Sequence, residues 1–346
     1  MKNIFYVLIL LSIIFTNSCT HTKKELTENS NENNVTPKNN QVEEFFDLDI
    51  NGSKQRVLIQ SNNVEDNPIL LYLHGGPGSS AMMYAYLYSD RIKDNFIFVN
   101  WDMRGAALSL HDDTNPELVS EGQIAEDAVN LIHYLLDKYN KKKIYLIGHS
   151  FGSVLGMYLV DNYPDLFSAY IGIGQVISYR ESVPVIYEWL HKTLVDAGDQ
   201  EALARIEKDH FPYFDIVKKY GGHHRLSLDL NSLLMGSPYY FDGYLDLLDK
   251  GRRFSMINVG KNPSTFGTPS DMTQTTVPLY FFEGRNDHVV ACAPELVVKY
   301  CETVDAPVKK IVWFENSAHM LNVEEPEKFQ SEVINVLNET QNNFSD

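Results

Sequence analysis

The chain has 346 residues, of which 44% are hydrophobic, so it can bury a large apolar core. Asp and Glu total 46 against 29 Lys and Arg, which gives a formal net charge of −17. Nucleic-acid binding needs a basic surface that displaces counterions from phosphates, and the sequence holds no such stripe. We therefore expect no nucleic-acid partner.

The start of the chain is predicted to direct export. Residues 4–15 are almost wholly apolar, too few to span a bilayer but typical of a signal peptide. Cys19 follows them, as in the lipobox of bacterial lipoproteins, and we favour its acylation over an ordinary cleaved signal with a chance cysteine. The sequence thus predicts a signal peptide at 1–18 and a lipid on Cys19, followed at 19–43 by a disordered tether that is poor in large apolar residues. Such a protein is exported and held to a bacterial membrane only through its lipid; without the lipid it is secreted or periplasmic.

From residue 44 the pattern changes to alternating strands and helices. A hairpin is predicted at 45–50 and 55–60, because Asn51-Gly52 separates the two apolar runs. Continuous apolar runs indicate strands buried on both faces at 69–73, 96–101, 144–147 and 170–173. Residues 124–139 have helical spacing, and a further helix face begins at Val154.

This rhythm is interrupted once and then resumes. Residues 176–272 show helical segments, such as 185–206, and no buried strand. Strands are again predicted at 278–282 and 310–314, and helices at 295–301 and 327–337. We predict a mostly parallel, doubly wound α/β sheet built from residues 44–175 and 273–346, with a helical cap at 176–272 inserted between its two parts.

The segment Gly148-His149-Ser150-Phe151-Gly152 lies between a predicted strand and a predicted helix. A sharp turn there would raise the Ser150 hydroxyl above the sheet, and it needs small residues two positions either side of the serine. The alternative is a chance Gly-x-Ser-x-Gly in a tight turn. The strand-to-helix context favours a nucleophilic serine.

A serine hydroxyl is a weak nucleophile and needs a base. Of the eleven histidines, His319 lies in a polar loop directly after the strand 310–314. His149 lies inside the serine turn, and His223 and His224 lie in the cap. The acid that orients the base is expected after a late strand, between serine and histidine in chain order. Asp287 meets that condition, whereas Asp305 and Glu315 fit it less well.

The loop His74-Gly75-Gly76-Pro77-Gly78 follows the strand 69–73. Glycines let backbone N–H groups approach a ligand closely, and a tetrahedral oxyanion needs such donors. We assign the N–H groups of Gly76 and Phe151 to an oxyanion hole. The alternative is that the glycines only form a structurally required turn.

These segments resemble the α/β-hydrolase superfamily, and within it the prolyl iminopeptidase-related group, from Glu44 to the C-terminus. The chain has four features in the same order as that group: the His-Gly-Gly-Pro-Gly loop, the serine turn, a Gly-Arg-x-Asp acid loop and an Ala-His base loop. The resemblance implies a cap over the active site and release of an N-terminal residue, usually proline, from short peptides. It also implies acidic cap residues that bind the substrate amine. Glu181 and Glu188 are candidates, with solvated helix charges as the alternative.

Some positions depart from that group. His149 and Phe151 replace the usual Gly and Trp of the serine turn. Ala107 stands where the segment Asp102-Met103-Arg104-Gly105-Ala106-Ala107-Leu108-Ser109 usually has Gly. These differences leave the predicted fold and Ser150, His319 and Asp287 untouched but bear on the substrate.

We predict a serine hydrolase that acts on short peptides or other small substrates and needs neither cofactor nor metal. The leading hypothesis is an aminopeptidase of the proline iminopeptidase type. A carboxylesterase or small-amide hydrolase is the alternative, with aromatic cap residues as an acyl pocket, and a surface binding module without catalysis is an alternative of another class. Ser150 argues against epoxide hydrolases and haloalkane dehalogenases, whose turn resembles this one but carries an aspartate nucleophile.

Two further cysteines, Cys292 and Cys301, flank the predicted helix at 295–301. Their separation along a helix would strain or forbid a disulfide, so we expect free thiols in the core. No Cys/His spacing in the sequence matches a zinc site.

Overall fold

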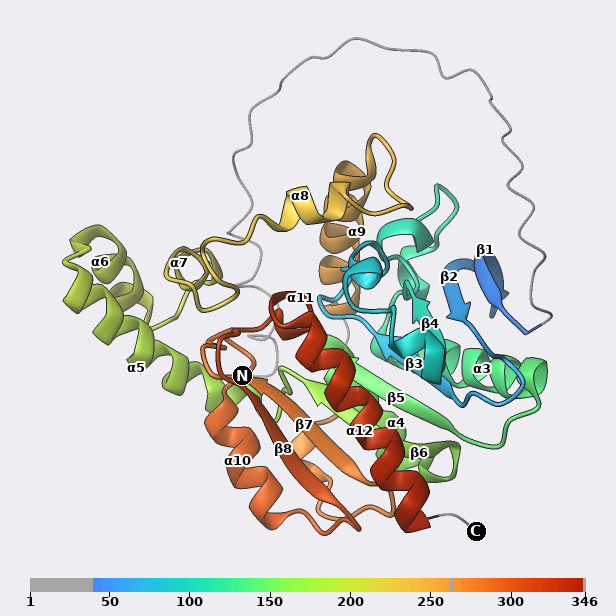
Figure 1. The fold of residues 1–346 in the computed structure, drawn as a ribbon. Coiled ribbons are helices and arrows are strands. Elements are labelled where there is room, and N and C mark those ends of the chain that lie inside the picture. The colour runs from blue at the N-terminus through green and yellow to red at the C-terminus, as the bar shows by residue number, and fades with distance from the viewer. Residues whose placement is uncertain (1–39, 262–263, 345–346) are drawn as a thin grey trace.

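The computed structural model describes residues 40–261 and 264–344, which form an eight-stranded sheet covered by helices (Figure 1). The strand order is β1-β2-β4-β3-β5-β6-β7-β8. β1 (Val42–Ile50) is antiparallel to β2 (Ser53–Ser61), and β2 is antiparallel to β4. The strands from β3 onward run parallel to one another: β3 (Ile69–Leu73), β4 (Ile97–Trp101), β5 (Ile144–His149), β6 (Phe167–Ile173), β7 (Leu279–Gly284) and β8 (Lys309–Phe314). The predicted mostly parallel, doubly wound sheet is confirmed.

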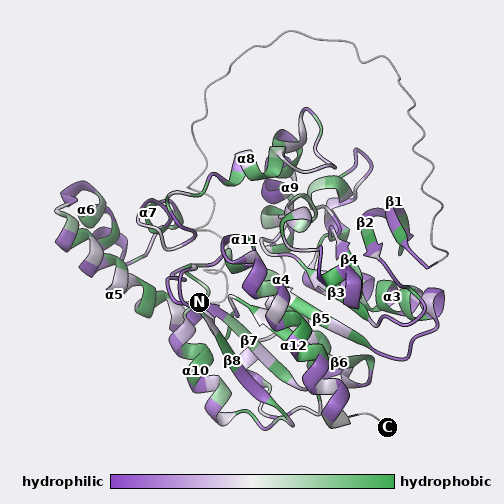
Figure 2. Cartoon of the chain, in the orientation of Figure 1, coloured by the Kyte–Doolittle hydropathy of each residue, from purple (hydrophilic) through white to green (hydrophobic). Residues whose placement is uncertain are grey.

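Apolar side chains lie on both faces of the sheet and form two cores. Along β3, Ile69, Leu71 and Leu73 belong to one core, whereas Leu70 and Tyr72 belong to the other. This alternation follows from the two-residue period of a strand. The first core includes residues of the helices α3 (Glu121–Tyr139), α4 (Phe151–Asn162) and α10 (Pro294–Thr303). The second core includes residues of α2 (Ile92–Asn95) and α12 (Pro326–Phe344). Figure 2 shows the polar residues gathered on the outer sides of the helices, as a three-layer molecule requires.

The hairpin at the N-terminal edge has its predicted turn. Asn51 and Gly52 both have positive φ, 51° and 71°, as a type I′ turn requires. β1 begins at Val42, so ordered structure starts inside the segment 19–43 that we predicted as tether. The predicted signal peptide 1–18 and Cys19 lie outside the described residues. No helix that the structure describes has both the length and the apolar character needed to cross a bilayer.

The segment between β6 and β7 is helical. It holds α5 (Tyr179–Ala197), α6 (Gln200–Asp209), α7 (Phe214–Lys219), α8 (Leu230–Met235) and α9 (Tyr244–Val259), and its described residues form no strand of the sheet. The stretch 185–206, predicted as one helical segment, is divided between two helices. Gly198 ends α5 at a φ of 69°, and the side chain of Asp199 caps α6. In Figure 1, α5 and α6 extend to one side of the sheet, while α8 and α9 lie above it.

Candidate active site

Three predicted site residues follow parallel strands at their carboxyl ends. Ser150 comes directly after β5, Asp287 three residues after β7, and His319 five residues after β8. Because β5, β6, β7 and β8 are parallel neighbours, these loops meet at one edge of the sheet. That edge is where open α/β sheets bind ligands.

Ser150 has a strained backbone. Its φ of 54° and ψ of −118° lie outside the regions that L-residues favour, and α4 begins at the next residue. The Ser150 N–H donates to the carbonyl of Ile173 at 3.0 Å, and the hydroxyl of Ser153 donates to the Ser150 carbonyl at 2.6 Å. These bonds hold a half-buried serine in the sharp strand-to-helix turn that the sequence predicts.

The glycines of this turn are required by close packing. A Cβ on Gly152 would lie 2.2 Å from the carbonyl oxygen of Leu73, and one on Gly148 would lie 2.6 Å from the carbonyl oxygen of Gly152. A Cβ on Gly75 would lie 3.0 Å from the Cβ of Ser150. The first distances exclude any side chain, and the last brings the glycine loop after β3 against the serine.

His319 and Asp287 form a buried pair. The Nδ1 of His319 lies 2.7 Å from Oδ2 of Asp287, and the two residues are 5% and 0% exposed. Oδ1 of Asp287 accepts from the Val289 N–H at 3.0 Å. Because a carboxylate only accepts, this geometry assigns the proton to Nδ1 and leaves Nε2 of His319 as an acceptor. The imidazole is thereby held in the tautomer of a general base.

A chain of buried hydrogen bonds fixes the backbone of His319. His149 Nε2 lies 3.0 Å from the His319 carbonyl and must donate to it. His149 Nδ1 then accepts from the hydroxyl of Tyr72 at 3.2 Å, and that hydroxyl accepts from Asn322 Nδ2 at 3.3 Å. Burial holds the pKa of His149 well below its usual value, so its imidazole is neutral. His149 therefore positions the loop of His319.

The cap reaches the same edge through residues 222–225. The carbonyl of Gly222 accepts from the His288 N–H at 2.9 Å, and the carbonyl of His223 accepts from the His319 N–H at 3.1 Å. The Arg225 N–H donates to Oε1 of Glu324 at 2.7 Å. This cap segment therefore contacts the loops of both Asp287 and His319. Sequence reasoning missed it, because only Gly221-Gly222 marks a turn there.

The two predicted oxyanion donors come from two segments near Ser150, the start of α4 and the glycine loop after β3. Phe151 is the first residue of α4, a position whose N–H has no acceptor within the helix. Gly76 belongs to the loop that Gly75 brings against Ser150, and its φ of 124° favours glycine. His74 orders this loop: its Nδ1 donates to the Gly75 carbonyl at 2.7 Å, and its Nε2 accepts from the Met103 N–H at 3.0 Å. Burial lowers the pKa of His74 to about 4, which keeps it neutral.

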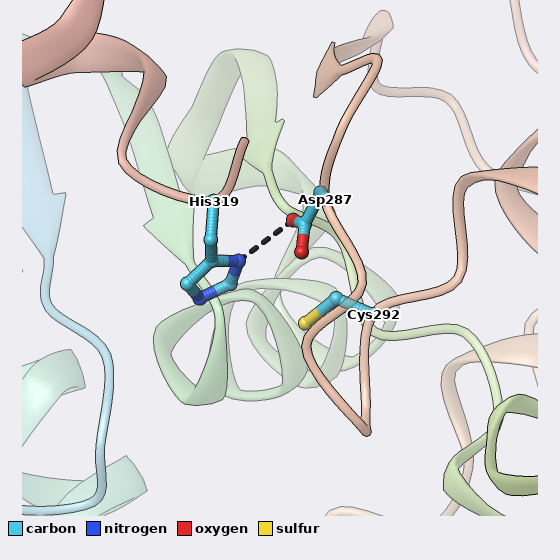
Figure 3. Close-up of side chains that lie close together, drawn as sticks. All are labelled: Asp287, Cys292 and His319. Carbon is cyan, nitrogen blue, oxygen red and sulfur yellow. Dashed lines mark hydrogen bonds and ion pairs between the residues drawn. The ribbon is translucent and has the colours of Figure 1, made fainter. Parts of the chain in front are cut away.

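Cys292 lies at this site, which sequence reasoning missed. Figure 3 shows its sulfur turned toward the side chains of Asp287 and His319, and a ligand atom from each of the three lies within 4.8 Å of the others. Cys292 is a free thiol, as predicted, and so is Cys301, which is half-buried on α10. Only the three-dimensional packing of the loop after β7 reveals the place of Cys292.

Glu181 and Glu188, the predicted amine-binding residues, lie exposed on α5. The described residues show no side-chain contact between either carboxylate and the site.

Comparison with known proteins now places the chain in a family. The sequence model of a family described as alpha/beta hydrolase fold matches residues 68–326. The protein belongs to the α/β hydrolase family. The chain is 29% identical over 311 residues to a probable aminopeptidase, YbaC, of Bacillus subtilis, covering 85% of this chain and 96% of that protein. It is 25% identical over 277 residues to a proline iminopeptidase of Saccharolobus solfataricus, covering 76% and 82%.

Solved structures agree on the fold of this α/β hydrolase. The crystal structure of a proline iminopeptidase from Mycobacterium smegmatis aligns with a TM-score of 0.63 and 16% identity, covering 86% of this chain and 98% of that one. At that identity the likeness shows the shared fold alone. The predicted superfamily is confirmed, and the homology to aminopeptidases extends over most of the chain.

Proposed function

We propose that this α/β hydrolase is a serine hydrolase that releases the N-terminal residue, proline above all, from short peptides. One observation carries the proposal: Ser150 stands on a strained strand-to-helix turn at the sheet edge that also holds the buried His319–Asp287 pair. Strain of this kind persists only where the surrounding structure maintains it, and it clusters at active sites.

The proposed reaction proceeds through an acyl-enzyme. Nε2 of His319 takes the proton of the Ser150 hydroxyl as its oxygen attacks the scissile carbonyl. The N–H groups of Phe151 and Gly76 stabilise the tetrahedral oxyanion. Asp287 stabilises the imidazolium, which then protonates the departing amine. A water molecule, activated by the same histidine, releases the acyl product and restores Ser150.

The names of the relatives support the peptidase assignment over other hydrolyses. The segment between β6 and β7 supports a small substrate, since the backbone of its residues 222 and 223 is hydrogen-bonded to the loops of Asp287 and His319. An ester is the second candidate, and the exposure of Glu181 and Glu188 favours it. With both carboxylates in solvent, the ammonium group of a peptide has no assigned partner.

The first test compares kcat/KM of the full-length chain on a prolyl anilide and on a short-chain nitrophenyl ester, with Ser150→Ala as the inactive control. We expect the anilide to be preferred and Ser150→Ala to lose both activities. Preference for the ester would replace the peptidase by the esterase. If neither substrate is cleaved and a fluorophosphonate probe fails to label Ser150, the non-catalytic binding module becomes the better interpretation.

Glu181→Gln and Glu188→Gln extend the same assay. If either carboxylate binds the substrate amine, its variant raises KM for the anilide and leaves the ester unaffected. If both variants have the kinetics of the wild type, the two residues are solvated helix charges and do not bind the substrate.

We also propose that the protein is exported and anchored by a lipid on Cys19. The support is the apolar run at 4–15 and the position of the cysteine after it. In a bacterial host, the wild type should fractionate with membranes and incorporate labelled palmitate. Cys19→Ala should do neither, while Cys301→Ala should behave as the wild type. Release of the wild type into the soluble fraction would contradict the anchor.

A further inference from the structure

A thiol, a carboxylate and an imidazole converge beside Ser150. The ligand atoms of Cys292, Asp287 and His319 all lie within 4.8 Å of one another (Figure 3). Zinc binds thiolate, imidazole and carboxylate at about 2.0–2.3 Å in a tetrahedron, which places ligand atoms roughly 3.5 Å apart. Small side-chain movements would therefore bring these three atoms into one coordination sphere.

We propose that Asp287, Cys292 and His319 form an inhibitory binding site for a borderline or soft divalent metal ion, with Zn²⁺ as the physiological type. One sulfur, one nitrogen and one oxygen donor suit Zn²⁺ and Cd²⁺, whereas Mg²⁺ and Ca²⁺ prefer oxygen donors alone. That a bound ion inhibits rests on the proposed function of Ser150 and His319, but the site itself does not.

The charges in the site balance. On coordination the thiol of Cys292 loses its proton to solvent, and the resulting thiolate together with the carboxylate of Asp287 offsets the two positive charges of the ion. The imidazole is a neutral ligand. A buried ion is tolerated when it is paired in this way, and these three residues are each at most 5% exposed.

A buried carboxyl group next to the cluster provides an independent observation. Glu283 is fully buried, and its Oε2 has no hydrogen-bond partner among the described residues. Glu283 lies near the end of β7, four residues before Asp287. An unpaired buried acceptor of this kind needs compensation, and a cation in the cluster would supply it.

Either mode of coordination removes the base. An ion on Nδ1 of His319 replaces the 2.7 Å hydrogen bond to Asp287. An ion on Nε2 occupies the lone pair that would accept the proton of Ser150. The same ion would also bind the sulfur of Cys292, whose ligand atom lies within 4.8 Å of those of His319 and Asp287. A metal ion in this cluster is thus incompatible with the proposed catalysis.

Binding is tested without reference to activity. The full-length chain carrying Cys19→Ser and Ser150→Ala is titrated with Cd²⁺, and the ultraviolet absorption of a cadmium–thiolate bond is followed. We expect a saturable band that is lost on adding Cys292→Ala or Cys292→Ser and kept on adding Cys301→Ala. Asp287→Asn, which retains the thiol, should weaken Cd²⁺ binding at least tenfold. A band that depends on Cys301 instead, or no band at all, would overturn the site.

Inhibition is tested on chains with Ser150 intact. Zn²⁺ should abolish hydrolysis, a chelator should restore it, and Mg²⁺ should have no effect. Relative to its own uninhibited rate, Cys292→Ala should need at least tenfold more Zn²⁺ for half-inhibition, while Cys301→Ala should match the wild type. Equal sensitivity of Cys292→Ala would refute inhibition at this site. If the wild type hydrolyses nothing, the proposed function fails, and the cadmium band alone decides whether the metal site exists.

Discussion

Gly174, directly after β6, offers a direct test of the His319–Asp287 pair. A Cβ at this position would lie 2.6 Å from Nδ1 of His319 and 3.0 Å from Oδ2 of Asp287. Both distances are shorter than normal contacts, and both atoms belong to the hydrogen bond that orients the imidazole. Gly174→Ala should therefore push the two side chains apart without removing any functional group.

The expected loss of activity follows from that displacement. Misplacing a reacting group by about 1 Å can cost on the order of 10²-fold in rate. Loss of the orienting carboxylate costs up to about 10⁴-fold in serine proteases with a Ser-His-Asp triad. We expect kcat/KM of Gly174→Ala to fall by roughly 10²–10⁴ on whichever substrate the wild type cleaves.

The backbone contributes separately, because Gly174 has a φ of 50°. An L-residue in the left-handed region costs about 1–2 kcal/mol, offset by roughly 0.4–1 kcal/mol from the lower entropy of the unfolded chain. Gly198→Ala is the matched control. Gly198 has a φ of 69°, and a Cβ there would meet nothing within 4 Å, so its variant carries the backbone penalty without the clash.

Steady-state kinetics and chemical denaturation of both variants separate the two effects. Both should lose about 1 kcal/mol of unfolding free energy from the backbone, but only Gly174→Ala should lose activity. Wild-type kcat/KM in a folded Gly174→Ala protein would refute the role assigned to the His319–Asp287 hydrogen bond. An equal loss of activity in Gly198→Ala would show that backbone strain, and not contact with the pair, is responsible.

Three further predictions concern stability. The strained backbone of Ser150, with its φ of 54°, costs about 1–3 kcal/mol, and glycine would relieve that strain. In urea denaturation, the unfolding free energy of Ser150→Gly should therefore be roughly 1–2 kcal/mol above that of Ser150→Ala. Equal values for the two variants would mean that no strain is stored at this position. Asp127 forms a buried ion pair with Arg104 at 2.7 Å, so Asp127→Ala should lose about 3–5 kcal/mol of unfolding free energy. Asp196 forms an exposed ion pair, so Asp196→Ala should lose less than about 1 kcal/mol. Similar losses in the two variants would contradict the importance of burial. Burial raises the pKa of Asp102 from 3.8 to about 7, so the native state holds a proton that the unfolded chain releases, and stability falls as pH rises from about 4 to 7. Asp102→Asn should therefore match the wild type near pH 4 and exceed it by up to about 4 kcal/mol at pH 8, and a gap independent of pH in denaturation curves would contradict this.

Much of the fold could be predicted because its signals are local. Short runs of apolar residues such as 69–73 indicate strands buried on both faces, and Asn51-Gly52 supplies the two left-handed residues of a hairpin turn. The break at Gly198 was harder to predict, because the apolar spacing continues across it. Gly198 ends the first helix, and the side chain of Asp199 caps the start of the next.

The three predicted residues of the candidate site could also be found from local sequence signals, but the residues around them could not. Ser150, Asp287 and His319 each follow a strand end, so topology alone predicts that they meet. Cys292 is separated from His319 by a helix and a strand, and its approach to the pair depends on how the loop after β7 packs. The same holds for residues 222–225, whose backbone bonds to the site carry no side-chain signature.

The structure explains why a glycine is usual at the position of Ala107 in the related group. Its φ is 35°, in the region where glycine is favoured, which accounts for the usual glycine at this place in the related group. The backbone of Ala107 also packs against the cap, since a Cβ on Gly251 of α9 would lie 2.4 Å from the Ala107 nitrogen. Gly78, in the loop assigned to the oxyanion hole, approaches the same helix, and its Cβ would lie 2.6 Å from the Gly251 carbonyl oxygen. The cap helix α9 is thus packed at backbone distance both on the segment of Ala107 and on the loop of Gly78.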